Sequence, residues 1–416
     1  MSSEGGFTLA PADVPWLDDG PAAKLLAVLD AGGEEARAVG GAVRNTLMQL
    51  PPGDVDIATT ALPEEVLRRA RAAGFHPVPT GIEHGTVTVV VAGTPFEVTT
   101  LRQDIETDGR HAAVRFGRDW QADAERRDFT MNALFLTRER RVIDFVGGVA
   151  DIEARRVRFI GDPDTRIRED YLRILRFFRF FAAHGEGVPE GASLAACIRN
   201  RGGLAQLSRE RVRVETMKLL PGKRAAEAAT AMAESGILDR VLAGVADLPA
   251  LTRMAAIETA MQLEPDAVRR LAALAVRVVE DAERLRERLR LSNDEYRRLV
   301  AVGDGWWRVL PSADDAAART LLYRLGADAY RDRALVAFAR ARMPEPAAWA
   351  ALLSLPERWT PPKFPLSGKD FLARGLAKGP ALGAALRRAE KAWIAAGFPT
   401  EPERAAAIAD EVVKVP

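Results

Sequence analysis

Hydrophobic and polar positions follow two different patterns along the chain, and the change falls near residue 150. In the first part, short runs rich in valine and threonine predict β-strands, and the segments between them have helical spacing. The predicted elements are a helix over 21–31, strands over 36–39 and 54–58, a helix over 63–73, a hairpin of strands over 84–92 and 94–101, and a last core strand over 132–136. The polar stretch 102–127 has little periodicity and gives no clear element.

After residue 150, alanine, leucine and arginine dominate, helical spacing recurs, and strand signals almost vanish. A chain of 416 residues exceeds what one hydrophobic core usually spans, so several domains are expected. The predicted fold class is α+β, with a mixed-sheet head followed by an elongated all-helical remainder. The expected parts are a head over 1–150, a neck over 151–221, a body over 222–355 and a tail over 356–416.

The cysteine content and the apolar runs limit the class of protein. A single cysteine, Cys197, excludes an internal disulfide, and with only four scattered histidines it argues against a structural zinc site. No run of about 18 uncharged apolar residues occurs, so no membrane span is expected. The N-terminus lacks the basic start and apolar run of a secretory signal. These features predict a cytoplasmic protein.

The formal net charge of +1 hides a local excess of basic residues. Between Arg199 and Arg224 the sequence has eight basic and two acidic residues. Such a segment can bind a phosphate backbone through counterion release, or it can be the solvated face of a helix. Charge alone leaves both interpretations open.

The most informative motif combines two glycines with two closely spaced acids. Gly40 and Gly41 precede Asp54 and Asp56 by a spacer of helical length. In an extended strand, residues two apart point the same way, so the two carboxylates project together and repel unless a cation lies between them. Such a pair can hold a divalent metal for phosphoryl transfer, and a glycine turn at a helix start lets backbone N–H groups approach a triphosphate.

A third acid, Glu97, lies inside the apolar run Phe96-Glu97-Val98, where an unpaired carboxylate is costly. It is either a third metal ligand or a carboxylate of an edge strand that faces water. Each feature alone is ambiguous, because a lone Asp-x-Asp is common in loops and a lone Gly-Gly is usually a turn. Their conjunction favours a metal-dependent nucleotide site.

The segment GGAVRNTLMQLPPGDVDIATTALPEEV resembles the first motif of the polymerase-beta-like nucleotidyltransferase superfamily, and within it the bacterial (class II) tRNA nucleotidyltransferase and poly(A) polymerase family. The resemblance implies that Asp54 and Asp56 bind two Mg²⁺ ions, that Glu97 assists them in catalysis, and that Gly40, Gly41 and Arg44 bind the nucleotide. Asn45 departs from the pattern, because an aspartate commonly follows the arginine in the family.

A second motif, Glu125-Arg126-Arg127-Asp128-Phe129-Thr130-Met131-Asn132-Ala133, also resembles the family. Guanidinium groups match phosphate geometry, so Arg126 and Arg127 are expected to reach triphosphate or ribose oxygens. Asp128 is expected to orient one of them or to contact the sugar. Without the resemblance, an Arg-Arg-Asp sequence would be a surface ion pair of little energy.

Residues 101–111 resemble the flexible loop of the family, with Arg102, Asp104 and Arg110 as its candidate residues. A polar segment of this length that contains glycine is either a mobile functional loop or disordered. We interpret it as a lever that adjusts the site between successive nucleotides.

The sequence Glu169-Asp170-Tyr171-Leu172-Arg173 opens a strongly helical run, in which Asp170 and Arg173 share a face. An ordinary helix-stabilising pair would have the same spacing. The segment resembles the nucleotide-selecting motif of the family, which implies that Asp170 and Arg173 read the edges of C and A. Arg176 and Arg179 continue this face and are candidates for phosphate binding or packing.

Two further segments resemble the family. Residues 208–215 begin with a partial capping box at Ser208 and are expected to brace the preceding helix, with Arg209 and Arg213 as weaker candidates for contact with nucleotide or RNA. Near the end, Lys369 lies at a predicted helix start in Pro365-Leu366-Ser367-Gly368-Lys369, where a tRNA phosphate or a plain helix cap fits equally well.

The resemblance implies addition of C, C and A to the 3′ end of tRNA from CTP and ATP, with release of pyrophosphate. The alternatives are a poly(A) polymerase, a partial enzyme that adds only C or only A, and a non-catalytic RNA-binding relative. Intact acids argue against the last alternative, and a full-length loop favours the complete activity. The expected partners are tRNA and nucleoside triphosphates, with no membrane; the oligomeric state is not predicted.

Overall fold

The structure is a computed structural model, and it describes residues 6–107, 112–311, 315–342 and 345–414. Its internal contacts divide the chain into two compact units. The first unit comprises Met1–Leu248, Pro265–Ala267 and Arg288–Arg290, and the second comprises Pro249–Glu264, Val268–Glu287 and Leu291–Pro416. The four-part division at residues 150, 221 and 355 stays a prediction.

The head of the first unit is built on an eight-stranded sheet with the order β1-β10-β9-β2-β3-β6-β5-β4. Strand β3 pairs with β6 in parallel, and the other neighbours are antiparallel, so the sheet is mixed. The strands are β1 (Gly6–Thr8), β2 (Ala36–Val39), β3 (Asp56–Thr59), β4 (His76–Gly81), β5 (Thr86–Val91), β6 (Thr94–Thr100), β9 (Leu134–Leu136) and β10 (Arg141–Asp144).

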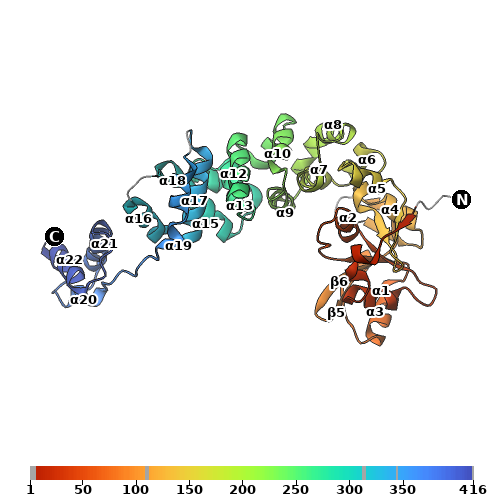
Figure 1. Cartoon of the computed structure of the whole chain (residues 1–416), viewed down its shortest axis with the longest axis horizontal. Coiled ribbons are helices and arrows are strands. Elements are labelled where there is room, and N and C mark those ends of the chain that lie inside the picture. Colours follow the sequence, from red (N-terminus) through yellow and green to blue (C-terminus); the bar gives the residue numbers. More distant parts are fainter. Residues whose placement is uncertain (1–5, 108–111, 312–314, 343–344, 415–416) are drawn as a thin grey trace. The chain divides into compact units, whose positions relative to one another are not determined.

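Alternation of side chains explains why one face of this sheet is buried. In β5, Val87, Val89 and Val91 are buried, whereas Thr86, Thr88 and Val90, which alternate with them, are partly exposed. Helices α1 (Pro21–Leu29) and α3 (Pro63–Ala72) pack against β5 and against each other (Figure 1). The other head helices are α2 (Gly41–Leu47), α4 (Trp120–Glu125) and α5 (Gly148–Glu153).

Helices follow the sheet in the first unit. They are α6 (Pro163–Glu169), α7 (Leu172–His184), α8 (Gly191–Asn200), α9 (Arg209–Leu219), α10 (Ala225–Glu234) and α11 (Leu238–Leu242). Helix α7 is central, because it packs against both α9 and α10. Its phenylalanines recur at helical spacing, and Phe177, Phe178 and Phe181 are buried.

Aromatic packing joins the head to α7. Phe129, which directly follows the Arg-Arg-Asp motif, lies with its ring centroid 4.9 Å from that of Phe159 and 5.1 Å from that of Phe180. Phe159 in turn stacks on Phe177 at 5.8 Å. Because these rings are almost wholly buried, they fix the Arg-Arg-Asp motif against the side of α7.

Among the described residues of the second unit, all regular secondary structure is helical. Its helices are α12 (Leu248–Ala260), α13 (Ala267–Ala275), α14 (Val279–Leu289), α15 (Asn293–Gly303), α16 (Ala316–Leu325), α17 (Ala327–Arg340), α18 (Pro346–Leu353), α19 (Leu355–Arg358), α20 (Gly368–Leu372), α21 (Pro380–Ala395) and α22 (Pro402–Lys414). The last three pack around Phe371, which is fully buried. Elsewhere in the unit, the buried carboxylates of Glu258 and Asp332 share the guanidinium groups of Arg269, Arg270 and Arg298.

The predicted α+β arrangement, a mixed sheet followed by helices, is confirmed, but several elements differ. Strands β1 and β4 lie where no strand was predicted. The stretch 102–127 contains β7 (Arg102–Thr107), β8 (Ala112–Phe116) and helix α4, where no clear element was expected. The last core strand is β10 rather than residues 132–136, of which only β9 is a strand. Asp54 lies before β3, which begins at Asp56. No helix within the described ranges is long and apolar enough to cross a bilayer.

Candidate active site

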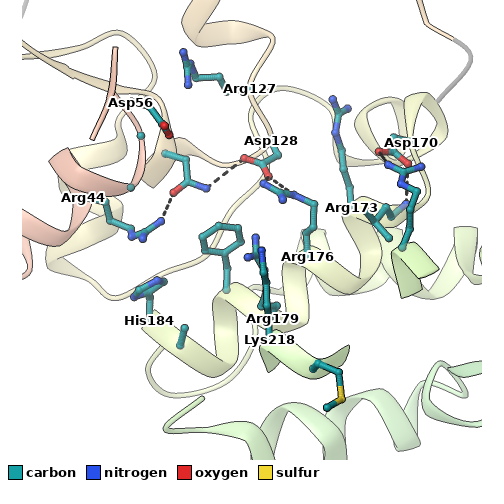
Figure 2. Close-up of a pocket in the computed structure, with 18 of the residues that line it drawn as sticks. Arg44, Asp56, Arg127, Asp128, Asp170, Arg173, Arg176, Arg179, His184 and Lys218 are labelled. Carbon is teal, nitrogen blue, oxygen red and sulfur yellow. Dashed lines mark hydrogen bonds and ion pairs between the residues drawn. The ribbon is translucent and has the colours of Figure 1, made fainter. Parts of the chain in front are cut away.

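One large pocket, of about 910 Å³, lies within the first unit where the head meets α7 and α9 (Figure 2). Its lining has eight cationic side chains and three carboxylates, which gives it a strong positive charge. The cationic residues are Arg44, Arg126, Arg127, Arg173, Arg176, Arg179, Arg211 and Lys218, and the carboxylates are Asp56, Asp128 and Asp170. Most of the residues singled out in the sequence therefore come together here.

The glycine pair forms the turn between β2 and α2. Gly40 has φ +75° and ψ −125°, a conformation that L side chains rarely adopt, so the turn requires glycine there. A Cβ atom at Gly40 would lie 3.9 Å from the Oδ2 atom of Asp56, which places the turn beside that carboxylate. Helix α2 has only seven residues, so its dipole is a weaker attraction for anions than the side chain of Arg44.

Arg44 is the most deeply placed cation of the pocket, with an exposed fraction of 8%. Its Nη1 atom donates to Oδ1 of Asn132 at 2.5 Å. Its Nε and Nη2 atoms donate to Oδ1 of Asn45 at 3.1 and 2.8 Å. Burial, with the repulsion of Arg179, lowers the pKa of Arg44 to about 10, which still leaves it charged at neutral pH.

The predicted catalytic acids gather at one end of neighbouring strands. The pairing of Ile57 with Val98 places Asp56, one residue earlier in β3, beside Glu97 in β6. Burial and the like charges of Glu97 and Asp54 raise the pKa of Asp56 to about 6, although Arg127 opposes them. Asp54 and Asp56 therefore lie close enough to interact, although only Asp56 belongs to the strand.

Glu97 does not face the core, contrary to the reasoning from its apolar neighbours. Phe96 and Val98 are buried, whereas the side chain of Glu97 is exposed on the other face of β6. The strand lies between β3 and β5, so Glu97 is not on an edge strand either. Within the described ranges, no group of three or more His, Cys, Asp or Glu side chains is arranged to hold a metal ion. The metal-binding role of Asp54 and Asp56 thus stays a prediction.

Asp123, which the sequence analysis did not single out, holds both arginines of the second motif. It is 1% exposed, and it accepts from Nε of Arg126 and from Nη2 of Arg127, each at 2.8 Å. Burial opposes the ionisation of Asp123, but the two guanidinium groups outweigh it and keep its pKa below the ordinary value. Its position three and four residues before the arginines was a helical signal available in the sequence.

Asp128 orients Arg176, rather than Arg126 or Arg127 as expected. Its Oδ2 atom accepts from Nε of Arg176 at 2.7 Å, while its Oδ1 atom accepts from the backbone N–H of Phe129 at 2.9 Å. Arg176 and Arg179 also approach Glu215 of α9, at 3.7 and 2.8 Å. The guanidinium groups of Arg44, Arg176 and Arg179 surround the ring of Phe180 at 4.4–5.5 Å, which gives the pocket a rigid cationic wall.

Asp170 and Arg173 both line the pocket, but they do not share one helix. Helix α6 ends at Glu169, Asp170 is extended with φ −156° and ψ 107°, and α7 begins at Leu172. The Oδ1 atom of Asp170 accepts from the backbone N–H of Leu172 at 3.0 Å, so the side chain caps α7. The expected continuous helix over this motif is therefore wrong, because Asp170 occupies the break between two helices.

The partners of Asp170 and Arg173 come from both neighbouring helices. Oδ2 of Asp170 accepts from Nη2 of Arg211 at 2.6 Å. Arg173 donates to the carbonyl of Arg166 at 2.6 Å and forms an ion pair with Glu169. Figure 2 shows Asp170 and Arg173 on one side of the pocket and Asp56 and Arg44 on the other.

The remaining sequence candidates lie outside this pocket. Ser208 caps α9 by accepting from the N–H of Arg211 at 3.4 Å, and it is Arg211 that reaches the pocket lining rather than Arg209 or Arg213. At Lys369 the plain helix cap is present, since the N–H of Ser367 donates to Asp370 at 2.7 Å. Contact of Arg209, Arg213 or Lys369 with RNA stays a prediction.

Of the three candidate loop residues, Arg102 and Asp104 lie within the described part of the chain. Arg102 donates to the backbone carbonyl of His84. Asp104 lies in β7, and Arg110 lies outside the described residues. The lever function of this segment stays a prediction.

Comparison with known proteins agrees with the geometry of the site. Residues 36–158 match the model of the Poly A polymerase head domain, and residues 189–248 match that of the probable RNA and SrmB-binding site of polymerase A. The chain is 34% identical over 376 residues to the mitochondrial CCA tRNA nucleotidyltransferase 1 of Mus musculus, covering 89% of this chain and 85% of the relative. It is 32% identical over 408 residues to the CCA-adding enzyme of Limosilactobacillus fermentum, covering 95% and 97%. The chain belongs to the CCA-adding enzyme family.

A solved structure of the CCA-adding enzyme family supports the same conclusion. The Bacillus stearothermophilus CCA-adding enzyme in complex with CTP matches with a TM-score of 0.77 and 28% identity, over 98% of this chain and 99% of the other. The resemblance drawn from the carboxylate, Arg-Arg-Asp and nucleotide-selecting motifs is thereby confirmed. The match covers both the sheet that carries Asp56 and the helices α6 and α7 that flank Asp170.

His184, at the end of α7, gives the site a testable pH dependence. Burial, together with the nearby charges of Arg44, Arg179 and Arg155, lowers the pKa of His184 to about 3. The folded protein thus keeps His184 neutral at pH 5, whereas the unfolded chain binds a proton near pH 6.5. The free energy of unfolding is therefore expected to fall as the pH drops below about 6.5. His184 contributes to the slope of this free energy against pH at most the amount that corresponds to one bound proton.

Urea unfolding at pH 7, 6 and 5 measures this effect. Because other groups also titrate, the informative quantity is the difference in slope between the wild type and His184→Gln. We expect a shallower loss of stability on acidification for the variant. Equal slopes for the two proteins would show that His184 titrates normally in the fold.

Proposed function

We propose that this chain adds C, C and A to the 3′ end of tRNA, using CTP and ATP and releasing pyrophosphate. The observation that carries the proposal is a single pocket with two kinds of residue on its two sides. Asp56 and Arg44 offer a carboxylate and a guanidinium for transfer of a nucleotidyl group, while Asp170 and Arg173 offer an acceptor and a donor for a base edge. Chemistry and base selection would then act on the same bound nucleotide.

The charge of the pocket supports a triphosphate as the ligand. Eight cationic side chains against three carboxylates suit a polyanion, and arginines match phosphate oxygens in two-point contacts. Arg44, Arg176 and Arg179 are fixed by hydrogen bonds or ion pairs before any ligand binds. A pre-organised cationic wall loses little side-chain entropy on binding.

In the proposed reaction, the 3′-hydroxyl oxygen of the RNA attacks the α-phosphorus of the nucleotide. The new O–P bond forms as the bond to pyrophosphate breaks in line with it, and the hydroxyl proton is released. Arg44 and the other arginines of the wall neutralise the charge of the leaving pyrophosphate. Asp170 and Arg173 hold the base, so that the α-phosphorus is presented in one geometry.

The residues at the strand ends fit Mg²⁺ by their chemistry. Carboxylate oxygens are the ligands that Mg²⁺ prefers, and burial, together with the like charges of Glu97 and Asp54, raises the pKa of Asp56 to about 6, so that a cation bound there would stabilise its ionised form. Asp54 and Asp56 would hold two ions, with Glu97 aiding the one nearest the hydroxyl. When bound, the metal activates the hydroxyl and offsets the charge that develops on the phosphates.

The RNA partner is part of the proposal. A CCA-adding enzyme of Thermotoga maritima has been solved in complex with tRNA, and at 18% identity and a TM-score of 0.62 it supports the likeness of fold. We propose that the helices beyond the head, including the tail over 356–416, bind the acceptor arm of tRNA. A cytoplasmic location stays a prediction from the cysteine content.

The test is incubation of the purified chain with tRNA that lacks its last three residues. With CTP alone we expect two added nucleotides, with CTP and ATP together three, and with ATP alone none. A ladder of many A residues from ATP alone would instead identify a poly(A) polymerase. A stop after two C residues with both nucleotides present, or addition of A only to tRNA that already ends in CC, would identify a partial enzyme.

A further inference from the structure

The pocket arginines differ in what neutralises them. Six of the seven form ion pairs with carboxylates of the chain: Arg126 and Arg127 with Asp123, Arg173 with Glu169, Arg176 with Asp128, Arg179 with Glu215, and Arg211 with Asp170. Arg44 has no such partner among the residues that the structure describes. Its guanidinium donates three hydrogen bonds, all to the amide oxygens of Asn45 and Asn132.

Burial makes the absence of a carboxylate partner informative. Arg44 is 8% exposed, and a buried cation without a counterion costs more than one that is paired. Its pKa is lowered to about 10 by that burial, in contrast to Arg176, whose pKa is raised beside Asp128 in spite of burial. An open positive charge held rigidly in a pocket is suited to an anionic ligand that arrives as its counterion.

Asn45 connects Arg44 to the segment that leads to the catalytic acids. Its Oδ1 atom accepts from Nε and Nη2 of Arg44. Its Nδ2 atom donates to the carbonyl of Pro51 at 3.0 Å and to that of Pro52 at 3.4 Å, which lie three and two residues before Asp54. One amide thus faces a donor on one side and acceptors on the other, so both of its ends are satisfied.

We propose that Asn45 is a positioning residue that aims Arg44 at the triphosphate while leaving the charge of Arg44 open, and that ties Arg44 to the 51–54 segment. The proposal rests on the proposed function, because it names the part of the nucleotide that Arg44 binds. It also gives a physical role to the one position where the first motif departs from the aspartate common in the family.

Replacing Asn45 with aspartate and replacing it with alanine are expected to have different effects. An aspartate would still accept from Arg44, but it would neutralise the guanidinium and turn a carboxylate oxygen toward the carbonyls of Pro51 and Pro52, where no donor remains. An alanine would leave the charge open but would release both Arg44 and the 51–54 segment. The aspartate therefore tests the charge, and the alanine tests the orientation.

The experiment measures kcat, the KM for CTP and the KM for tRNA lacking its last three residues, together with the inhibition constant of inorganic tripolyphosphate. For Asn45→Asp we expect the KM for CTP and the inhibition constant of tripolyphosphate each to rise about tenfold, since a charge-assisted contact is weakened. The KM for tRNA should stay within about twofold, because a change confined to the phosphate contact leaves RNA binding intact. Asn45→Ala should raise the KM for CTP by a smaller factor and also lower kcat.

A matched control separates the local effect from the general effect of a new charge. Asn293, outside the pocket, also accepts from an arginine, with Nη2 of Arg286 at 3.2 Å from its Oδ1 atom. Asn293→Asp should leave all four constants unchanged.

The outcomes distinguish this inference from the proposed function. A wild type that adds no nucleotide would contradict the proposed function itself. An active wild type with an unchanged KM for CTP in Asn45→Asp, or with equal rises in the KM for CTP and for tRNA, would overturn the inference alone. If Asn45→Asp fails to unfold cooperatively, Asn45→Ala decides: an unchanged KM for CTP in that variant would likewise overturn it.

Discussion

Replacing Asp56 with asparagine is expected to abolish nucleotide addition while leaving the fold intact. Asp56 is the carboxylate that lines the pocket at the strand end, beside the Gly40 turn and Glu97. Asparagine has nearly the same shape, but it cannot supply the negative charge that a divalent cation requires. We expect kcat to fall by about a thousandfold or more, which corresponds to roughly 4 kcal/mol of transition-state stabilisation.

The stability of Asp56→Asn is a second measurement, independent of its activity. Because the pKa of Asp56 is raised to about 6, its ionised form destabilises the folded state at pH 7 when no metal is present. The neutral amide removes that cost, so the free energy of unfolding in metal-free buffer should be unchanged or higher. A substitution that lowers activity but preserves stability is expected where a carboxylate serves to bind a ligand rather than to stabilise the fold.

The control for Asp56→Asn is Asp294→Asn, which removes an exposed carboxylate outside the pocket. It should leave kcat unchanged. If the kcat of Asp56→Asn stays within about tenfold of the wild-type value, Asp56 is not a metal ligand, because loss of a metal ligand lowers kcat far more. A large loss of stability would instead show that Asp56 supports the fold.

Replacing Asp170 with alanine is expected to relax the choice among the four nucleotides. Asp170 offers a carboxylate to the pocket, and its geometry is fixed by Arg211 and by the N–H of Leu172. A site built to hydrogen-bond a base edge rejects a wrong base because its buried polar groups are then left unpaired. We expect the ratio of kcat/KM for CTP to that for UTP to fall by about 10- to 100-fold.

Two further variants isolate base recognition from the support of α7. Asp170→Asn keeps an oxygen that can accept from the N–H of Leu172, so it tests recognition without loss of the helix cap. Asp164→Ala removes an acid of α6 that pairs with Arg199 outside the pocket, and it should not alter selectivity. An unchanged CTP to UTP ratio in both Asp170 variants would exclude Asp170 from base recognition.

The sequence alone predicted the fold class and most of the pocket residues. The spacing of Gly40, Gly41, Asp54 and Asp56 is local, so strand and turn geometry were enough to bring these residues to one place. The valine and threonine alternation of β5 and β6 likewise identified the hairpin that carries Glu97. Local periodicity is reliable where a strand has one buried face.

Contacts between segments that are far apart in the sequence could not be predicted from local sequence patterns. Asp128 and Arg176 are 48 residues apart, and no spacing rule connects a loop acid with a helical arginine. The break at Asp170 was missed because helical spacing continues on both sides of it; in the structure Asp170 is extended and its side chain accepts from the N–H of Leu172, the first residue of α7. Strands β7 and β8 were missed because neither sequence has the alternation that marks a half-buried strand.

The most direct test of the account is a crystal structure of the chain with CTP and Mn²⁺, whose anomalous signal locates the metal. We expect the triphosphate to lie against Arg44 and the Gly40–Gly41 turn, the cytosine edge to meet Asp170 and Arg173, and manganese to lie on Asp54 and Asp56. A nucleotide bound outside this pocket, or manganese held by other residues while the two aspartates remain free, would contradict it.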